Sequence, residues 1–343
     1  MSHFRVVMAD YDSDLFAPPD WIGPQLAQEG IEWLAYQKRS PEAVVEVARD
    51  ADMVIVQSVR PLLTGAVLAQ LPRCRCVVRL GIGYDSVDVT TATQLGILVC
   101  NAPGFCTEDV AEHALALLLN GVRHIARQDR LVREGRWERS GALPSVRMKG
   151  RTLGFVSFGS IARALAELVK GFNMTLLAYD PYLSAEVMAR YGVRKVELDE
   201  LLRQADYISV HTPLSQDTYH LLGASEFDLM KPGVVLVNTS RGSIIDETAL
   251  VRAMRSGKVW AAGLDVFEQE PLPLDSPLRL FDTITMTPHV AASSDESVCD
   301  LYRICCQIVM DVRDGRWPAS VVNPEVAGRA RFPFQPPGIR PLE

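Results

Sequence analysis

Short runs of apolar and β-branched residues alternate with helix-like segments along most of the chain, and this alternation restricts the fold more than any other feature. Continuously apolar strands that are separated by helices predict parallel sheets covered on both faces, so we expect an α/β, doubly wound fold. The ten expected strands are Phe4–Met8, Met53–Gln57, Cys76–Leu80, Ile97–Cys100, Leu153–Phe158, Thr175–Tyr179, Tyr207–Val210, Val234–Asn238, Trp260–Leu264 and Thr283–Met286. The expected helices between them include Glu42–Arg49, Glu108–Leu119, Ile161–Lys170 and Thr248–Ser256.

The length and the grouping of these strands predict two domains. A chain of 343 residues exceeds what one core of ordinary size requires. The first four strands form one group, and the six from Leu153 onward form another. Between the groups, residues 120–150 interleave charged side chains with Trp137, which indicates a long helix and an extended arm that packs on a second subunit. After Asn323 the chain holds five prolines, and we expect it to be draped over the surface or disordered.

Composition excludes several classes of partner. The net charge of −7 comes without a basic run, so nucleic acid is not an expected partner. No signal-like segment and no apolar run near 18 residues is present, which predicts a cytoplasmic protein without a membrane partner. The seven cysteines have no spacing typical of zinc sites, so we expect mostly buried free thiols and no metal.

The segment 153–163 reads as a strand that turns through small residues into a helix. It fits the dinucleotide-binding pattern as Ser157-x-Gly159-x-x-Ala162, in which small residues allow a tight turn, close approach of the pyrophosphate and helix–strand contact. Serine in place of the first glycine is a departure that either weakens cofactor binding or only reshapes the turn. Taken alone, the pattern also fits an ordinary strand–turn–helix.

Asp180 favours the dinucleotide interpretation. It ends an apolar strand, twenty-one residues beyond Gly159. A carboxylate in this place accepts hydrogen bonds from ribose hydroxyls and repels a 2′-phosphate, so NAD is expected rather than NADP. A phosphate-binding loop of the GxxxxGK type is excluded, because residues 154–160 contain no lysine.

Three further polar residues follow predicted strands: Arg241, Glu270 and His289. Each has an ordinary explanation alone, as a surface ion-pair partner, a solvated carboxylate and a core histidine respectively. However, ligands bind at the carboxyl ends of strands in open parallel sheets. Their order, spacing and positions after strands therefore favour one shared site.

Together these motifs closely resemble the D-isomer-specific 2-hydroxyacid dehydrogenase family, over roughly residues 50–325. The branches that the chain resembles most are those of phosphoglycerate dehydrogenase and the C-terminal-binding proteins, and segments 79–88 and 179–183 are similar to the latter. The segments that carry the family resemblance are Ser157–Ala162 with Asp180, His211–Leu214, Val237–Gly242 continuing to Asp246, Leu264–Pro271 and Thr287–His289.

The resemblance implies a role for each of the three residues. His289 is expected to be the acid–base group, since an imidazole pKa of about 6.5 suits proton transfer near neutral pH. Glu270 is expected to hydrogen-bond the other ring nitrogen; we prefer it to Glu268 because it directly precedes Pro271. Arg241 is expected to bind the substrate carboxylate and the reacting oxygen. Hydride passes between substrate C2 and the nicotinamide ring.

Other contacts implied by the resemblance surround these residues. Asp265 and the main chain near Thr239 are expected at the nicotinamide carboxamide, Thr107 at the nearby ribose or phosphate, and 212–214 along the adenosine. The complete expected cofactor set is Thr107, Ser157, Phe158, Gly159, Ser160, Ile161, Ala162, Asp180, Thr212, Pro213, Thr239, Ser240, Arg241, Asp265 and His289. The expected substrate set is Arg60, Arg79, Ile82, Gly83 and Arg241, with the amides of Ile82 and Gly83 holding the carboxylate.

The resemblance also implies the domain organisation. Residues 1–103 and 291–325 are expected to form a discontinuous, flavodoxin-like substrate domain, and 104–290 a Rossmann NAD-binding domain, with the active site in the cleft between them. Residues 120–150 form the expected dimerisation arm of a homodimer, and 326–343 a proline-rich tail.

The implied function is the NAD-dependent interconversion of a D-2-hydroxy acid and its 2-keto acid. The alternative is an NAD-sensing, corepressor-like interaction protein with little or no catalysis. A dehydrogenase fold that has lost catalysis is a third possibility. Ala292 stands where the C-terminal-binding-protein branch carries a tryptophan, which puts that branch's substrate pocket in doubt.

Overall fold

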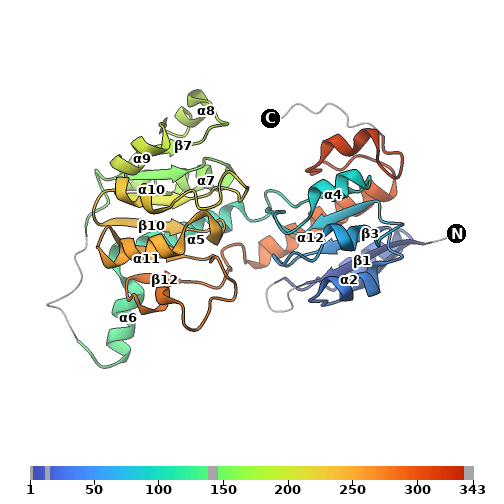
Figure 1. The fold of residues 1–343 in the computed structure, drawn as a ribbon, viewed down its shortest axis with the longest axis horizontal. Coiled ribbons are helices and arrows are strands. Elements are labelled where there is room, and N and C mark those ends of the chain that lie inside the picture. The colour runs from blue at the N-terminus through green and yellow to red at the C-terminus, as the bar shows by residue number, and fades with distance from the viewer. Residues whose placement is uncertain (1–2, 12–15, 138–145, 336–343) are drawn as a thin grey trace. The chain divides into compact units, whose positions relative to one another are not determined.

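The computed structural model describes residues 3–11, 16–137 and 146–335. The chain divides into two compact units (Figure 1). Unit 1 comprises Met1–Phe105 and Ser293–Glu343, and unit 2 comprises Cys106–Ala292. The chain passes from unit 1 to unit 2 between Phe105 and Cys106, and returns between Ala292 and Ser293.

Unit 1 is built on a five-stranded parallel sheet in the order β2-β1-β3-β4-β5, which is the flavodoxin-like order. Its strands are β1 (Phe4–Asp10), β2 (Ile31–Ala35), β3 (Met53–Val56), β4 (Cys76–Arg79) and β5 (Leu98–Cys100). Strand β2 was not predicted. It pairs only with β1 at the edge of the sheet and is mostly half-buried, so its sequence lacks the continuous apolar run of an interior strand.

Helices cover both faces of this sheet. The helices α2 (Pro41–Ala48), α3 (Gly65–Leu68) and α4 (Val89–Gln94) share a core with alternate residues of β1, including Val7. Met8 points to the opposite face, where the hydroxyl of Tyr302 on α12 (Asp295–Arg313) lies 3.6 Å from its sulfur. The helix α1 (Ile22–Gln28) contacts α12 there.

The beginning of the proline-rich tail is draped over unit 1. Pro324–Gly328 forms a short 3-10 helix in which Val326 is fully buried. Beyond it, the guanidinium of Arg331 donates hydrogen bonds to the carbonyls of Leu95, Leu71 and Cys74. The end of the predicted tail, 336–343, lies outside the described residues.

Unit 2 is built on a seven-stranded parallel sheet in the order β12-β11-β10-β9-β6-β7-β8. Counted from β6, this is the dinucleotide-binding order 3-2-1-4-5-6 with one further strand. The strands are β6 (Thr152–Val156), β7 (Thr175–Tyr179), β8 (Val193–Lys195), β9 (Tyr207–Val210), β10 (Val234–Asn238), β11 (Val259–Leu264) and β12 (Ile284–Met286). The three-residue edge strand β8 was also not predicted.

Two layers of helices enclose this sheet. The helices α5 (Thr107–Arg123) and α7 (Ser160–Leu168) pack on one face, and α9 (Leu198–Gln204), α10 (Ala224–Leu229) and α11 (Glu247–Arg255) on the other. The short α8 (Ala185–Ala189) lies against β8. A Cβ at Gly263 in β11 would lie only 2.6 Å from Leu117 Cβ, so glycine there lets α5 approach the sheet closely.

The predicted arm begins with the end of α5, which is followed by the helix α6 (Ile125–Arg133). Helix α6 is shorter than the long helix that we expected in this segment. Arg127 and Arg130 each have a guanidinium nitrogen 3.8 Å from the carboxylate of Asp282, a residue just before β12. Trp137 is 78% exposed in the single chain. Residues 138–145, including Leu143 and Pro144, lie outside the described part of the chain.

All seven cysteines are free, and six are buried, as predicted. Within the described ranges, no helix is both long and apolar enough to cross a membrane.

Candidate active site

The expected cofactor and catalytic residues of unit 2 follow six different strands. Ser157 follows β6, Asp180 follows β7 and Thr212 lies just beyond β9. The segment 239–241 follows β10, Asp265 follows β11 and His289 lies beyond β12. Because the strands are parallel, all six segments leave the sheet at the same edge. Thr107 is the first residue of α5.

The turn after β6 holds Ser157 in the left-handed region, with φ of 69°. Glycine adopts this conformation freely, whereas an L side chain is strained there. The Ser157 hydroxyl lies 3.0 Å from the Thr212 hydroxyl, which donates to the Val156 carbonyl at 3.0 Å. The serine therefore keeps the glycine-like turn and links β6 to β9, where the strand order reverses.

This arrangement predicts unequal effects of two substitutions at Ser157. Ser157→Ala keeps the strain but removes the hydroxyl pair, so the free energy of unfolding should fall by about 1 kcal/mol. Ser157→Gly relieves about 1–2 kcal/mol of strain. It also loses the hydrogen bond and adds freedom to the unfolded chain, each at about 1 kcal/mol, so its stability should stay close to wild type. Urea denaturation without cofactor measures both; an alanine variant as stable as wild type would contradict this account.

Helix α7 begins next to this turn and can accept an anionic group. Gly159 is its N-cap, no side chain caps it, and its first turn has no acidic residue. Gly159 and Ser160 are exposed, and a Cβ added at Gly159 would meet no atom of the described residues within 4 Å. Ala162 packs inward, and its small side chain suits the contact between α7 and the sheet. The helix N-terminus therefore fits a pyrophosphate.

Asp180 braces this turn through its buried carboxylate. One oxygen accepts from Phe158 N at 3.0 Å, and the other accepts from Tyr182 N at 2.9 Å and Leu183 N at 3.2 Å. Thus the predicted ribose-binding carboxylate already holds the loops on either side of it. Ser160 and Ile161 begin α7 beside it, and Pro213 follows Thr212 on the β9 side.

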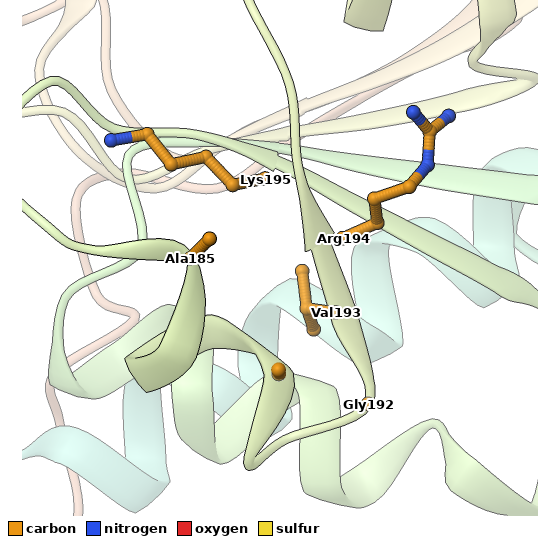
Figure 2. A pocket seen from close by; sticks show the side chains of 6 residues that line it. Ala185, Gly192, Val193, Arg194 and Lys195 are labelled. Carbon is orange, nitrogen blue, oxygen red and sulfur yellow. The ribbon is translucent and has the colours of Figure 1, made fainter.

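A surface hollow of about 430 Å³ lies between α8 and β8 (Figure 2). Figure 2 shows Lys195 and Arg194 pointing away from each other. The Lys195 ammonium donates to the Leu183 carbonyl at 2.5 Å, whereas Arg194 donates to Glu200 at 2.8 Å and to Gln204 at 2.9 Å. Both cations are therefore engaged within the chain.

His289 and Glu270 form a close pair. The imidazole Nδ1 lies 2.8 Å from Glu270 Oε2, and the other carboxylate oxygen accepts from Phe267 N at 3.0 Å. Burial opposes ionisation of Glu270, but its hydrogen bond with His289 and the charges of His289 and Arg241 outweigh burial and lower its pKa. With Nδ1 occupied, Nε2 is the ring nitrogen left for a reacting group.

Arg241 lies close enough to Glu270 to lower its pKa. Its segment is braced by Asn238, whose amide donates to the Arg241 carbonyl at 2.9 Å and accepts from the Ser240 hydroxyl at 2.7 Å. Next to it, a Cβ at Gly242 would lie 1.9 Å from the Phe267 carbonyl carbon. Glycine therefore lets the loop carrying Arg241 pass against the loop carrying Glu270.

Thr239 provides a further test of the cofactor assignment. Its hydroxyl oxygen is buried and, within the described residues, has no hydrogen-bond partner. An unsatisfied buried hydroxyl is costly, and a polar group of a bound molecule would satisfy it. This observation fits a nicotinamide carboxamide near the end of β10.

Asp265 holds the segment that carries His289. It is 1% exposed, and one carboxylate oxygen accepts from Thr287 Oγ1 at 2.6 Å and Val290 N at 2.9 Å. The other oxygen accepts from Ala291 N at 2.9 Å. The Asp265 side chain thus positions the His289 segment, while its expected contact with the nicotinamide stays a prediction.

Replacing Asp265 by asparagine should destabilise unit 2. One carboxylate oxygen becomes an NH₂ donor that faces a hydrogen-bond donor of the 287–291 segment. Leaving buried donors unsatisfied costs about 1–3 kcal/mol, which urea denaturation should detect. Asp282→Asn is the matched control, since its carboxylate is 74% exposed and its ion pairs contribute little. Equal stability of the two variants would contradict the assigned role.

The predicted substrate residues of unit 1 lie at or after the ends of β3 and β4. The Ile82 carbonyl accepts from the Asn101 side chain at 2.7 Å, and Gly83 follows it. Arg79 is buried, and its guanidinium lies where a Cβ of Gly81 would stand. Arg60 is exposed. Their contacts with substrate stay predictions.

Sequence reasoning missed polar residues that act through other residues. His113, on α5, has its Nε2 3.0 Å from Thr287 Oγ1 and 3.7 Å from Asp265 Oδ1. In unit 1, the buried Asp10 pairs with Arg39 and accepts from Ser58 N at 3.1 Å. A polar residue that ends an apolar strand was a usable signal for Asp10. Nothing in the helical pattern around His113 distinguishes it.

Comparison with known proteins identifies the family. The D-isomer specific 2-hydroxyacid dehydrogenase NAD binding domain matches residues 115–291. The glyoxylate reductase of Korarchaeum cryptofilum is 36% identical over 90% of this chain and 92% of its own length. The D-3-phosphoglycerate dehydrogenase of Archaeoglobus fulgidus is also 36% identical, over 91% of this chain but 59% of its own length.

Solved structures agree with this result. A D-lactate dehydrogenase from Aquifex aeolicus, complexed with NAD and lactic acid, has a TM-score of 0.78 and 27% identity over 91% of this chain and 96% of that chain. An acyclic imino acid reductase in complex with NADPH and D-Arg has a TM-score of 0.83 and 25% identity over 93% and 99%. The predicted family is thus confirmed: the chain belongs to the D-isomer-specific 2-hydroxyacid dehydrogenases, oxidoreductases that interconvert 2-hydroxy acids and 2-keto acids with a nicotinamide cofactor.

Proposed function

We propose that this chain reduces a small 2-keto acid to the D-2-hydroxy acid with NADH, using His289, Glu270 and Arg241. The observation that carries the proposal is the 2.8 Å pair of His289 and Glu270, close to Arg241 at the carboxyl edge of a dinucleotide-binding sheet. A bound nicotinamide supplies the hydride that reaches substrate C2. The chain's own residues then have to place the keto acid and manage one proton.

His289 is the proposed proton donor. Its Nδ1 hydrogen-bonds Glu270, so a proton on Nε2 is the one available to the keto oxygen. The carboxylate of Glu270 stabilises the imidazolium form that exists before transfer. In the reverse direction, neutral Nε2 takes the hydroxyl proton as C2 is oxidised.

Arg241 is the proposed anchor for the substrate. A guanidinium presents two parallel N–H donors that match a carboxylate, and its fixed charge stabilises negative charge that develops on the reacting oxygen. Because Asn238 and Gly242 hold the backbone around Arg241, its side chain starts from a fixed position.

The coenzyme preference that we propose is NAD over NADP. Asp180 ends β7 with a buried, backbone-bonded carboxylate, and a 2′-phosphate there would meet like charge. The nearby cations Lys195 and Arg194 are engaged with Leu183 and Glu200. The fold by itself does not determine the coenzyme, because the imino acid reductase of similar fold is in complex with NADPH.

Removing the charge of Asp180 should therefore shift coenzyme preference. In Asp180→Asn, the ratio of kcat/KM with NADPH to that with NADH should rise roughly tenfold or more, because like-charge contact costs several kcal/mol. Steady-state rates with both coenzymes measure the ratio, and the exposed Asp199→Asn on α9 is the control. An unchanged ratio would refute the role of Asp180.

The substrate class that we propose is a 2-keto acid with a short side chain, such as glyoxylate or hydroxypyruvate. The resemblance to a glyoxylate reductase over nearly the full length of both chains supports this choice. NADH oxidation with glyoxylate, hydroxypyruvate, pyruvate, phenylpyruvate and 2-ketoglutarate tests it. The highest kcat/KM should fall on one of the first three acids.

No turnover with any of these acids, despite bound nucleotide, would favour the alternative of an NAD-sensing interaction protein.

We also propose that the chain forms a homodimer. Support comes from the exposed apolar side chains Ile125 and Val132 of α6, with Trp137 just beyond it.

A further inference from the structure

A second group of ionisable side chains converges in unit 2, on residues that the proposed reaction does not use. His220 lies before α10, Asp246 caps the start of α11, and Glu268 lies in the loop after β11. One ligand atom from each residue lies within 4.8 Å of the other two. Because 220, 246 and 268 lie far apart in the sequence, no local spacing pattern reveals this group.

The imidazole of His220 is held in a fixed direction. Its backbone has a φ of 52°, a left-handed conformation that is uncommon for histidine. The amide of His220 donates to the Ser243 carbonyl at 2.8 Å, and the ring stacks on Tyr219 with centroids 4.0 Å apart. Backbone and stacking therefore hold the ring with Nε2 facing Glu268, and Asp246 completes the group.

The contact between His220 and Glu268 has the separation of an ion pair but not the angle of a hydrogen bond. Nε2 lies 3.1 Å from Glu268 Oε1, yet it is shielded from solvent and hydrogen-bonds to no described residue. Around a metal bound by imidazole and carboxylate at about 2.0–2.2 Å, neighbouring ligand atoms lie roughly 3–3.5 Å apart. The measured separation suits two ligands of one ion.

Each carboxylate accepts one backbone hydrogen bond and keeps further lone pairs. In Glu268 the accepting oxygen, Oε1, is also the oxygen that faces His220 Nε2. Asp246 Oδ1 accepts from Ala249 N at 2.9 Å, and Glu268 Oε1 accepts from Glu247 N at 2.8 Å. No hydrogen bond from the described residues reaches the second oxygen of either group. Two carboxylates and a neutral imidazole carry two negative charges, which a divalent cation balances.

We propose that His220, Asp246 and Glu268 bind one divalent transition-metal ion, with water completing its coordination. One imidazole with two carboxylates suits Mn²⁺, Co²⁺ or Zn²⁺. The ion joins the start of α11 to the loop after β11, two residues before Glu270. Its expected effect is to stabilise unit 2, independently of the chemistry proposed above.

Binding of Mn²⁺ tests this site directly. The full chain, treated with chelator and dialysed, is titrated with Mn²⁺ while electron paramagnetic resonance follows the free ion. Mn²⁺ prefers oxygen and imidazole ligands to thiolates, so the seven cysteines do not compete. Glu268→Gln keeps the shape of the side chain, and His220→Asn tolerates the left-handed backbone. Glu200→Gln, at an exposed ion pair on α9, is the matched control.

We expect one Mn²⁺ per chain in the wild type and in Glu200→Gln. Affinity should fall at least tenfold in Glu268→Gln and in His220→Asn, while circular dichroism shows both folded. Mn²⁺ should also raise the thermal midpoint of the wild type but not of these two variants. No binding by the wild type at millimolar Mn²⁺, or equal binding by all variants, would overturn the proposal. Because these measurements need no turnover, their outcome does not depend on whether the proposed reaction is correct.

Discussion

Replacing His289 by asparagine is expected to lower kcat for keto-acid reduction by about 10²- to 10⁴-fold, the usual contribution of a positioned acid–base group. Asparagine tolerates the φ of 57° that His289 adopts, so the backbone of the segment should persist. The substitution removes the proton donor that we propose on Nε2. Stopped-flow or steady-state measurement of NADH oxidation at saturating keto acid gives the ratio.

The binding of NADH separates this effect from a structural one. Fluorescence titration should give a dissociation constant for His289→Asn within a few-fold of the wild-type value, because the adenosine and pyrophosphate contacts that we propose lie at α7 and Asp180. If the variant keeps wild-type kcat, His289 is not the acid–base group. If coenzyme binding is lost together with turnover, the loss of activity reports disruption of the site.

Replacing Arg241 by glutamine should lower kcat/KM by roughly 10²- to 10³-fold, which is typical of removing one electrostatic stabiliser of a developing charge. Lysine should rescue little of this activity, since an ammonium cannot reproduce the paired donors of a guanidinium. Both kcat and KM should change, because Arg241 is proposed to contact the carboxylate in the ground state and the reacting oxygen in the transition state.

Arg252→Gln provides the comparison for Arg241. Arg252 is exposed on α11. Its replacement by glutamine changes the net charge of the chain by the same amount as Arg241→Gln. It should leave kcat/KM within two-fold of the wild type. Equal losses in the two arginine variants would indicate a general effect of charge and would contradict a specific role for Arg241.

The interior of both sheets was predictable because buried parallel strands are continuously apolar. Strands such as β7 and β10 were predicted with their exact bounds. The edge strands β2 and β8 were not, since each is only partly buried and carries polar residues, as in Arg194 of β8. The edge strand β5, which is apolar and fully buried, was predicted. The apolar pattern of a sequence reports burial, and burial is incomplete along β2 and β8.

The site was predictable to the extent that its residues follow strand ends. Glu270 and His289 meet as expected, and Glu268 instead contacts Glu247 and His220. What the sequence could not reveal is the support around them. The bonds from Asp265 to the His289 segment, and the approach of His113 to Thr287, join positions from different elements through tertiary packing.

Reduction of hydroxypyruvate with NADH deuterated at C4 of the ring tests the central claim most directly. Transfer of hydride to C2, with the proton delivered by the chain, predicts a glycerate product of D configuration with one deuterium at C2. Mass spectrometry and chiral chromatography read both features in one sample. Two results would contradict the account. One is glycerate of L configuration, and the other is glycerate without deuterium when both hydrogens at C4 of NADH are replaced by deuterium.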